Sequence, residues 1–435
     1  MNILLILPHD ATYRRGGFFR RSLSYAPLTL TTLAALVPPD VEARIELVDE
    51  GVQPAVTPRS GYDVVGITCV TASAPRAYAL ADAFRRLGSR VVLGGSHPSL
   101  NPHEARAHAT AVITGPAEQV WPELLRQWAA GQECGGVLAG RLEQPLSAPT
   151  PRRDLQPRGC YLSIPTVLAM RGCVHHCTFC SISPMWGGQA CPRPVAEVID
   201  EIRRLPQRRI LFLDPNLAAD AAYARELFAA LIPLRRRWGG LATIHLAEDV
   251  ELFDLAVRSG CMGILVGFES ADDHNLRACG KPIQEVGRHR EAVRRFHAHG
   301  ISVLGCFVFG FDHDDESVFA RTLAFVEATA IALPRFAVLT PFPGTPLFAA
   351  LEQAGRITSR DWQRYDTEHV VFQPARMDAA TLQQGLYTAW RAAYALPRVA
   401  RRVCRAGRHG ALAAASNLGF RYFAARVRAR GRTVT

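Results

Sequence analysis

The chain has 435 residues, and 48% of them are hydrophobic, so it can form more than one domain with a buried core. Its formal net charge is +11, but no stretch of about 18 apolar residues occurs that could serve as a transmembrane helix. Eleven cysteines without a recognisable export signal favour a reducing, cytoplasmic location over a disulfide-bonded secreted fold.

Residues 1–140 alternate short apolar runs with helical patterns of hydrophobic residues. This alternation predicts a doubly wound, Rossmann-like parallel sheet, in which ligands bind beyond the carboxyl ends of the strands. We expect strands at residues 3–7, 43–48, 64–68, 91–93 and 111–114, and helices at residues 28–37, 74–87 and 117–129.

Three of the expected strands end in residues suited to ligand binding. Hydroxyl groups follow the third strand, and glycines, which let a ligand approach the backbone closely, follow the fourth and fifth. The residues are Thr68, Thr71, Ser73, Gly94, Gly95 and Gly115. Because no G-x-G-x-x-G follows the first strand, the pattern does not indicate a dinucleotide site.

A region of low periodicity separates this domain from a second one. Residues 131–160 are rich in glycine, proline and arginine, and we place an interdomain linker at residues 141–160. Strand–helix alternation resumes over residues 161–347, and residues 348–435 form a mostly helical extension. Expected strands are 165–170, 209–213, 242–246, 263–268, 302–309 and 335–339, with helices at 195–205, 221–236, 251–259, 286–299 and 316–329.

Three cysteines lie close together directly after the first expected strand of the second domain. Cys173, Cys177 and Cys180 have C-x₃-C-x₂-C spacing, which allows their thiolates to gather at one metal centre. A structural zinc site normally takes four ligands, and His175 or His176 could supply the fourth. The other interpretations are an iron–sulfur cluster with one iron left open, and chance clustering.

This spacing, with Phe179 just before the last cysteine, resembles that of the radical S-adenosylmethionine (SAM) enzymes. The resemblance implies a partial (βα)6 barrel and a 4Fe–4S cluster held by Cys173, Cys177 and Cys180, with SAM on the open iron. It also implies SAM contacts at strand ends. The matching residues are Phe179, Asp214, Glu269 and Ser270, with Arg193 as a partner for the SAM carboxylate. A helix N-cap is the alternative role for Asp214, and a surface position is the alternative for Glu269.

The first domain is similar to the cobalamin-binding domain that precedes many radical SAM domains. The similarity rests on residues 63–68 and 93–98, and residues 341–347 match a phrase of the same subfamily. It implies a cobalamin site formed by Thr68, Thr71, Ser73, Gly94, Gly95 and Gly115. The Asp-x-His-x-x-Gly motif that supplies a cobalt ligand in other cobalamin proteins is absent, so we expect no protein histidine on cobalt.

Together the resemblances imply a methyltransferase that acts on an unactivated carbon of a small molecule, such as a natural product or a lipid. In such enzymes cobalamin takes a methyl group from one SAM, a second SAM yields a 5′-deoxyadenosyl radical, and the substrate radical receives the methyl group. One alternative is a non-methylating radical reaction, namely cyclisation, ring contraction or oxidation. Another is a non-catalytic cobalamin-binding protein with a structural metal.

Partners are implied less directly. The resemblance implies an electron donor such as flavodoxin or ferredoxin, and nothing in the sequence leads us to expect nucleic acid binding. Residues 398–432 contain arginines and no acidic residue. This basic tail is compatible with peripheral membrane contact, and a solvated helical end is the alternative.

Overall fold

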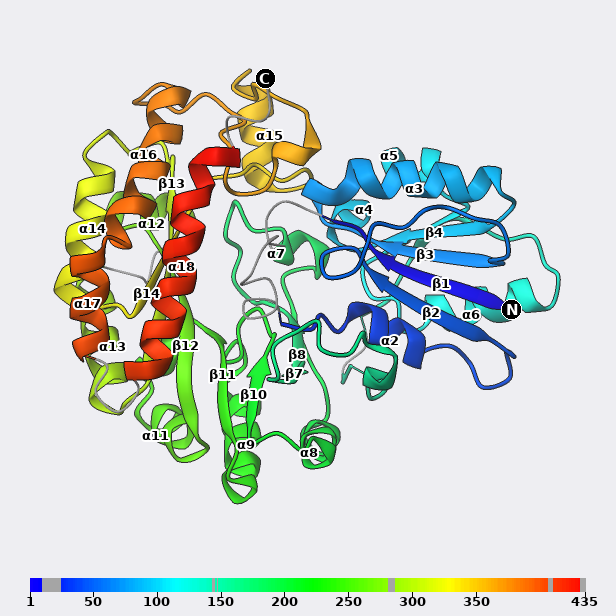
Figure 1. The fold of residues 1–435 in the computed structure, drawn as a ribbon, viewed down its shortest axis with the longest axis horizontal. Helices are drawn as coiled ribbons and strands as arrows, with labels where there is room; N and C mark the ends of the chain where they lie inside the picture. Colours follow the sequence, from blue (N-terminus) through cyan, green and yellow to red (C-terminus); the bar gives the residue numbers. More distant parts are fainter. Residues whose placement is uncertain (10–24, 143–144, 147, 281–285, 406–409, 431–435) are drawn as a thin grey trace.

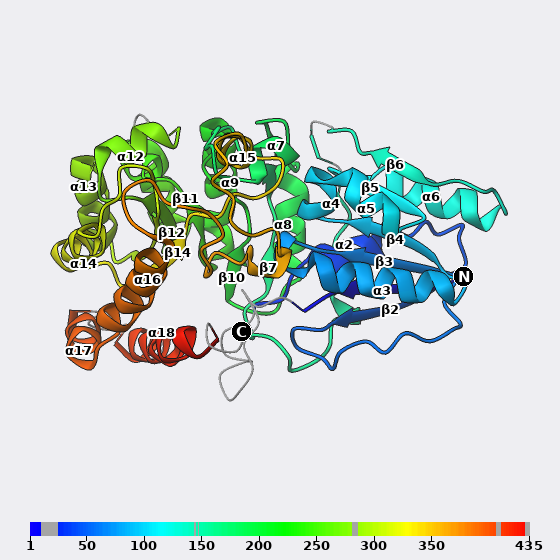
Figure 2. The same cartoon turned by 90° about the horizontal axis from the view of Figure 1, so that it is seen from above.

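The computed structural model describes residues 1–435 except 10–24, 143–144, 147, 281–285, 406–409 and 431–435. It contains two six-stranded sheets in two α/β units that lie side by side (Figures 1 and 2). The blue-to-cyan part of the ribbon is the first unit, and the green-to-yellow part is the second, with orange and red helices packed on it. The fold class expected from the sequence is therefore confirmed.

All neighbouring strands of the first sheet are parallel, in the order β2-β1-β3-β4-β5-β6. The strands are β1 (Asn2–Leu7), β2 (Arg44–Asp49), β3 (Val64–Thr68), β4 (Arg90–Gly94), β5 (Ala111–Thr114) and β6 (Gly136–Ala139). Since β2 and β3 lie on opposite sides of β1, the carboxyl ends of β1 and β3 form the switch point at which such sheets bind ligands.

Helices cover both faces of this sheet because its strands are apolar on both sides. Leu4 and Ile6 of β1 face a core that contains Phe84, whereas Ile3 and Leu5 face the opposite core. The helices are α2 (Thr29–Ala35), α3 (Ala74–Arg86), α4 (Ser96–Leu100), α5 (Pro102–His108) and α6 (Val120–Ala129), with the 3-10 turn η1 (Thr71–Ser73).

Strand β6 was not expected, because residues 131–160 lack periodicity. Its residues are alternately half-buried and exposed, and it begins with glycine, so its apolar pattern is weak. Parallel pairing along β5, from Ala111 with Gly136 to Thr114 with Ala139, holds it in place. A short edge strand of this kind depends on its neighbour more than on its own side chains.

The second sheet is also parallel, in the order β7-β10-β11-β12-β13-β14. Among the described strands β7 and β14 do not pair with each other, so this partial barrel is open on one side. The strands are β7 (Thr166–Val167), β10 (Arg209–Phe212), β11 (Arg237–Ala242), β12 (Cys261–Glu269), β13 (Ser302–Phe309) and β14 (Leu333–Val338), and β8 (Met170–Gly172) and β9 (Ala190–Pro192) form a separate antiparallel pair.

Two strand predictions in this unit are wrong. The strand expected at residues 165–170 is divided between β7 and β8, which belong to different sheets. The third strand is β11 and not residues 242–246, which run into a helix from His245 onward. A Cβ on Gly240 would lie 3.3 Å from the Cβ of Phe212, which is a tight contact, and this glycine weakens the apolar pattern by which strands are recognised.

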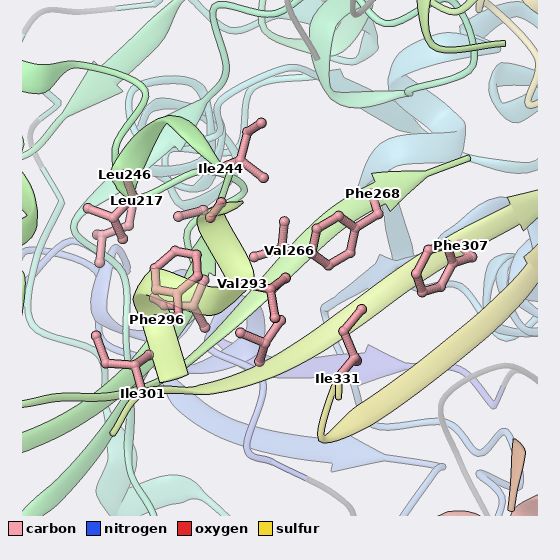
Figure 3. Close-up of a cluster of buried hydrophobic side chains, with 14 of the residues drawn as sticks. Leu217, Ile244, Leu246, Val266, Phe268, Val293, Phe296, Ile301, Phe307 and Ile331 are labelled. Atoms are coloured by element: carbon pink, nitrogen blue, oxygen red, sulfur yellow. The ribbon is translucent and has the colours of Figure 1, made fainter. Parts of the chain in front are cut away.

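The helices of the second unit pack on its sheet and form a core rich in aromatic residues. Figure 3 shows Val293 and Phe296 of α13 near Val266 and Phe268 of β12, and all four are buried in one cluster. Burial of each such side chain contributes about 1.5–3 kcal/mol. The helices are α7 (Ile182–Met185), α8 (Val195–Arg204), α9 (Ala221–Leu231), α10 (His245–Glu248), α11 (Val250–Arg258), α12 (Asp273–Ala278), α13 (Val286–Ala298) and α14 (Val318–Thr329), with η2 (Arg153–Leu155) and η3 (Ile232–Leu234).

The C-terminal extension covers the outer edge of β14. Trp390 Nε1 donates to the carbonyl of Phe336 at 3.1 Å, and the Tyr394 hydroxyl donates to that of Pro334 at 2.8 Å, which satisfies two edge carbonyls. The elements are α15 (Pro346–Gln353), η4 (Trp362–Arg364), α16 (Ala379–Ala393), α17 (Leu396–Arg405) and α18 (Gly410–Arg430). No described helix has the length and hydropathy of a membrane span, and residues 406–409 and 431–432 of the basic tail lie outside the described part.

Candidate functional site

The carboxyl end of β1 faces the second unit (Figure 1). Three contacts join the units near the carboxyl edge of the first sheet: Tyr161 OH with Asp49 Oδ2 at 2.7 Å, the backbone of Gly344 against Leu100, and Arg171 Nη1 with Glu118 Oε1 at 2.5 Å. Helix α7 also contacts α4 of the first unit. The loops expected to bind cobalamin therefore lie on the side of the first unit that meets the cysteine-bearing segment.

The cysteine loop (residues 173–180) is fixed by the β8–β9 pair, in which Arg171 pairs with Cys191 and Gly172 with Ala190. Gly172 has a φ of +76°, and a Cβ there would lie 2.0 Å from the carbonyl oxygen of Gln189, so glycine is required directly before Cys173. This ladder gave no sequence signal, because each of its strands has three residues.

Backbone contacts hold the cysteine loop against two other elements of the second unit. The Thr178 N–H donates to the Cys279 carbonyl at 3.2 Å, just after α12. The Leu347 N–H donates to the Thr178 carbonyl at 3.0 Å, at the start of α15. Residues 341–347, which were singled out by their sequence, thus end in direct contact with the loop.

The thiols of the loop are partly or fully withdrawn from solvent, Cys177 most of all. Burial raises the pKa of the Cys180 thiol, and the charges of Cys173 and Glu269 raise it further. Among the described residues, no group of three His, Cys, Asp or Glu side chains is close enough together to bind a single metal ion. A 4Fe–4S cluster takes its thiolates on different irons, so the three thiols of this loop fit a cluster with one iron left for SAM.

The two histidines of the loop make contacts that do not favour a zinc site. The ring of His175 stacks at 6.2 Å from that of His245, and His176 Nδ1 lies 3.2 Å from the Ser183 hydroxyl. Gly188 packs directly against the His176 ring. His176 is therefore held by the segment that follows the loop.

Glu269 ends β12 in a strained backbone conformation. Its φ is +61°, which is unfavourable for a residue with a side chain, and the register of β12 shifts between Gly267 and Glu269. The residue is buried, so a surface role is excluded. Strain of this kind persists where the surrounding structure requires a particular side-chain placement, as at a ligand-binding strand end.

Phe179 lies at the same end of the barrel. Its ring meets the edge of Phe311, which follows β13, at a centroid distance of 6.0 Å. The structure therefore brings together one aromatic side chain from the cysteine loop and one from the segment that follows β13.

Ser270 takes part in a buried network that joins the ends of β12 and β13. Asn275 Nδ2 donates to the Ser270 hydroxyl at 3.2 Å and to Asp314 Oδ1 at 2.7 Å. Asp314 Oδ2 accepts from the N–H groups of Gly310 and Phe311, and burial raises the pKa of this carboxyl to about 6. The Ser270 hydroxyl is thus engaged by the protein and positions the strand ends.

Asp214 is fully buried after β10 and is not a helix N-cap. Its carboxylate accepts from the N–H groups of Ala169 and Met170, which precede the cysteine loop. Burial raises the pKa of Asp214 to about 7, although these hydrogen bonds oppose the shift. The side chain therefore ties the second barrel strand to the segment that leads into β8.

The guanidinium of Arg193 is engaged by partners within the protein. Its guanidinium is buried and donates to Glu201 Oε2 at 2.8 Å and to the Leu168 carbonyl at 2.9 Å. Glu201 also accepts from Arg153, at 2.5 Å. Arg193 is thus bound inside the protein, which argues against its pairing with the SAM carboxylate.

The raised pKa of Asp214 predicts a pH-dependent stability. The folded chain retains a proton that the unfolded chain releases near pH 4, so stability is lost as the pH rises from about 4 to about 7. Between pH 5 and pH 8 the wild type should lose about 2–3 kcal/mol more than Asp214→Asn. Urea unfolding of both proteins measures this difference. The exposed Asp200→Asn is the matched control and should follow the wild type.

The loops after β3 and β4 pack closely at the carboxyl edge of the first sheet. The Cys69 N–H donates to the Gly94 carbonyl at 2.9 Å, and Gly95, with a φ of +103°, lies against the backbone of Cys69. The Gly115 N–H donates to the Ser99 hydroxyl at 3.0 Å. This arrangement leaves no space for a side chain at Gly95, because the loop after β3 fills the position that a Cβ would take.

Thr71 and Ser73 are buried, and their hydroxyls are engaged by the protein. Thr71 Oγ1 lies 3.3 Å from His97 Nδ1, and Ser73 Oγ contacts the backbone of Val70 at 3.2 Å. These two residues therefore shape the loop. Thr68, which is also buried, lies beside Gly95.

Sequence reasoning missed a further contact between the units, which involves Glu104. The Trp362 indole N–H of η4 donates to Glu104 Oε1 at 2.9 Å, and His97 Nε2 lies 3.5 Å from the same oxygen. Glu104 and Trp362 are 258 residues apart in the chain, so no local sequence pattern indicates that they meet.

Comparison with known proteins identifies both units. A family model described as the radical SAM superfamily matches residues 167–326, and one described as the B12 binding domain matches residues 41–125. These matches define an enzyme with a cobalamin-binding domain ahead of a radical SAM domain. Its cofactors are a 4Fe–4S cluster, SAM and cobalamin.

Similar proteins of known activity indicate which kind of radical SAM enzyme this is. The bacteriochlorophyllide d C-12(1)-methyltransferase of Chlorobaculum tepidum is 33% identical over 346 residues, which cover 77% of this chain and 75% of the relative. The C-8(2)-methyltransferase of the same organism is 29% identical and covers 82% of each chain. The fold is similar to that of TsrM from Kitasatospora setae, solved with cobalamin and a [4Fe-4S] cluster, with a TM-score of 0.65, 18% identity and coverage of 82% of this chain and 76% of that one. The chain belongs to the cobalamin-dependent radical SAM methyltransferases.

Proposed function

We propose that this methyltransferase acts on an unactivated carbon of a tetrapyrrole. The observation that carries the proposal is the 33% identity to a bacteriochlorophyllide methyltransferase, because it extends over 346 residues and so includes both units. A hopanoid-like lipid or another natural product is the alternative substrate class.

The proposed roles of the residues follow from their positions. Cys173, Cys177 and Cys180 hold the cluster. Glu269 orients the ribose of SAM, and Phe179, with Phe311, borders its adenosine. In place of the direct SAM contacts suggested by the sequence, Asp214 and Ser270 hold the backbone that forms this site.

Cobalamin is proposed to lie over the backbone of Gly94, Gly95 and Gly115, beside Thr68. Thr71 and Ser73 support this loop from within. When bound, SAM on the reduced cluster supplies a 5′-deoxyadenosyl radical, and cobalamin supplies the methyl group. The protein contributes by holding the two loops together and by closing the junction with apolar contacts such as Leu100 against Gly344, which exclude water.

The proposal includes a cytoplasmic location and a one-electron donor such as flavodoxin or ferredoxin. It also includes peripheral membrane contact through α17 and α18. Leu396 and Leu418 are 57% and 48% exposed there, and they are accompanied by arginines. Arg398, Arg402 and Arg421 have partners within the protein, so the exposed Arg401 and Arg405 would face anionic lipid.

Anaerobic turnover tests the proposal. The protein is reconstituted with iron, sulfide and cobalamin, and is then supplied with SAM, a one-electron reductant and either a chlorophyllide-type tetrapyrrole or a hopanoid. We expect 5′-deoxyadenosine, S-adenosylhomocysteine and a tetrapyrrole heavier by one methylene group. Methylation of the hopanoid alone would contradict the substrate class. Deoxyadenosine without S-adenosylhomocysteine would indicate a non-methylating reaction, and zinc in place of iron would contradict the cluster.

A further inference from the structure

Arg171 and Glu118 join the two loops that carry the cofactor residues. Glu118 lies in the loop after β5, three residues beyond Gly115, and Arg171 lies in β8, two residues before Cys173. Arg171 Nη1 is 2.5 Å from Glu118 Oε1. The side chains are 20% and 8% exposed, so this ion pair is largely shielded from solvent.

Arg171 is held in place by more than this contact. Its backbone pairs with Cys191 in the β8–β9 ladder, and its guanidinium lies over the Trp186 ring at 5.5 Å. These contacts restrict the position of the Arg171 side chain, so a movement of Glu118 would stretch the ion pair. The ion pair fixes the distance between the loop after β5 and the cysteine loop.

Glu118 retains hydrogen-bonding capacity that the described residues do not use. Both of its carboxylate oxygens are buried, and neither has a donor in hydrogen-bonding geometry among the described residues, although Arg171 lies close to Oε1. A buried carboxylate oxygen ordinarily accepts hydrogen bonds, because leaving it without a donor is costly. The carboxylate therefore has the capacity to accept a further hydrogen bond from a donor beyond the described residues, at this edge of the first sheet.

We propose that Glu118 accepts a hydrogen bond from a primary amide on the corrin ring of cobalamin while paired with Arg171, and so joins the cobalamin site to the cysteine loop. The corrin periphery carries several such amides, which are neutral donors, and a carboxylate strengthens a hydrogen bond from them. Glu118 lies in the same loop as Gly115, at the edge where cobalamin is proposed to bind. The inference concerns cofactor binding and does not depend on the identity of the substrate.

Titration with aquacobalamin, followed by absorption, tests this proposal in the anaerobically reconstituted protein. Glu118→Gln keeps the size of the side chain but removes the charge and leaves one neutral acceptor oxygen for both Arg171 and the corrin amide, so we expect the Kd to rise about tenfold or more. Glu118→Asp keeps the charge but shortens the reach, and an intermediate loss is expected. Arg171→Gln leaves the acceptor in place but removes the partner that orients it, so the Kd should rise less than with Glu118→Gln.

Two controls separate this role from a general effect on folding. Glu133→Gln removes an exposed ion pair with Arg90 in the same unit and should bind cobalamin like the wild type. Cobinamide, which keeps the corrin amides and lacks the nucleotide, should show the same loss with Glu118→Gln. A Glu118→Gln variant with normal iron content and a Kd within twofold of the wild type would overturn the proposal. A loss that disappears with cobinamide would overturn the assignment to a corrin amide.

Discussion

Replacement of Cys173, Cys177 or Cys180 with alanine is expected to remove the cluster and abolish SAM cleavage. Each thiolate binds a different iron, and the loop offers no fourth thiol to substitute for the one removed. The iron content of each variant should fall from about four to below one per chain. Deoxyadenosine should fall to background, because SAM has no open iron to bind.

Iron analysis, the visible absorption of the cluster and deoxyadenosine formation together check this result. Cys160→Ala is the matched control, because Cys160 is a partly exposed cysteine in the interdomain segment, and it should retain full iron and activity. Thermal unfolding establishes that each variant is folded. A variant at any of the three positions that kept full iron and cleaved SAM normally would contradict the assignment of that ligand.

Much of the fold could be predicted because parallel strands are buried on both faces and are read as short apolar runs. The strand expected at residues 302–309 coincides with β13, and that at 64–68 with β3. Strands β8 and β11 were missed or misplaced for a physical reason. The first depends on backbone pairing over three residues, and the second contains two glycines in a closely packed position, which interrupt its apolar pattern.

The sequence predicted where site residues lie better than it predicted what their side chains do. Asp214, Ser270 and Thr71 lie at the expected strand ends, but each makes hydrogen bonds within the protein. A polar residue at the carboxyl end of a strand can contact the ligand directly, or it can hold in place a backbone segment that contacts the ligand. The choice depends on neighbours brought close by folding, such as the Ala169 and Met170 N–H groups below Asp214, which local patterns do not reveal.

The contact between Glu118 and Arg171 also could not be predicted from local sequence patterns. Both residues were visible as neighbours of cofactor motifs, one after Gly115 and the other before Cys173. Opposite charges beside two motifs are a weak signal, because a chain with many arginines and carboxylates offers many such pairs. Only the tertiary arrangement of the two sheets shows that these two charges meet.

Gly95→Ala is expected to destabilise the first unit and to weaken cobalamin binding together. Gly95 has a φ of +103°, and a Cβ there would lie 2.5 Å from the Cys69 carbonyl oxygen and 2.9 Å from Thr68 Oγ1. The backbone strain and the overpacking together should cost about 3 kcal/mol. Because the loop after β3 must move to relieve the overlap, the Kd for aquacobalamin should rise more than about tenfold.

Gly88→Ala separates the two causes of this loss. Gly88 also has a positive φ, +87°, but a Cβ there would meet nothing within 4 Å, so only the backbone strain of about 1–2 kcal/mol applies. Urea unfolding and cobalamin titration of both variants make the comparison. If Gly95→Ala lost no more stability than Gly88→Ala and bound cobalamin normally, the close packing of the loops after β3 and β4 would have no part in the cofactor site. A larger loss at Gly95, with weaker binding, would show that this close approach of the two loops shapes the surface on which cobalamin rests.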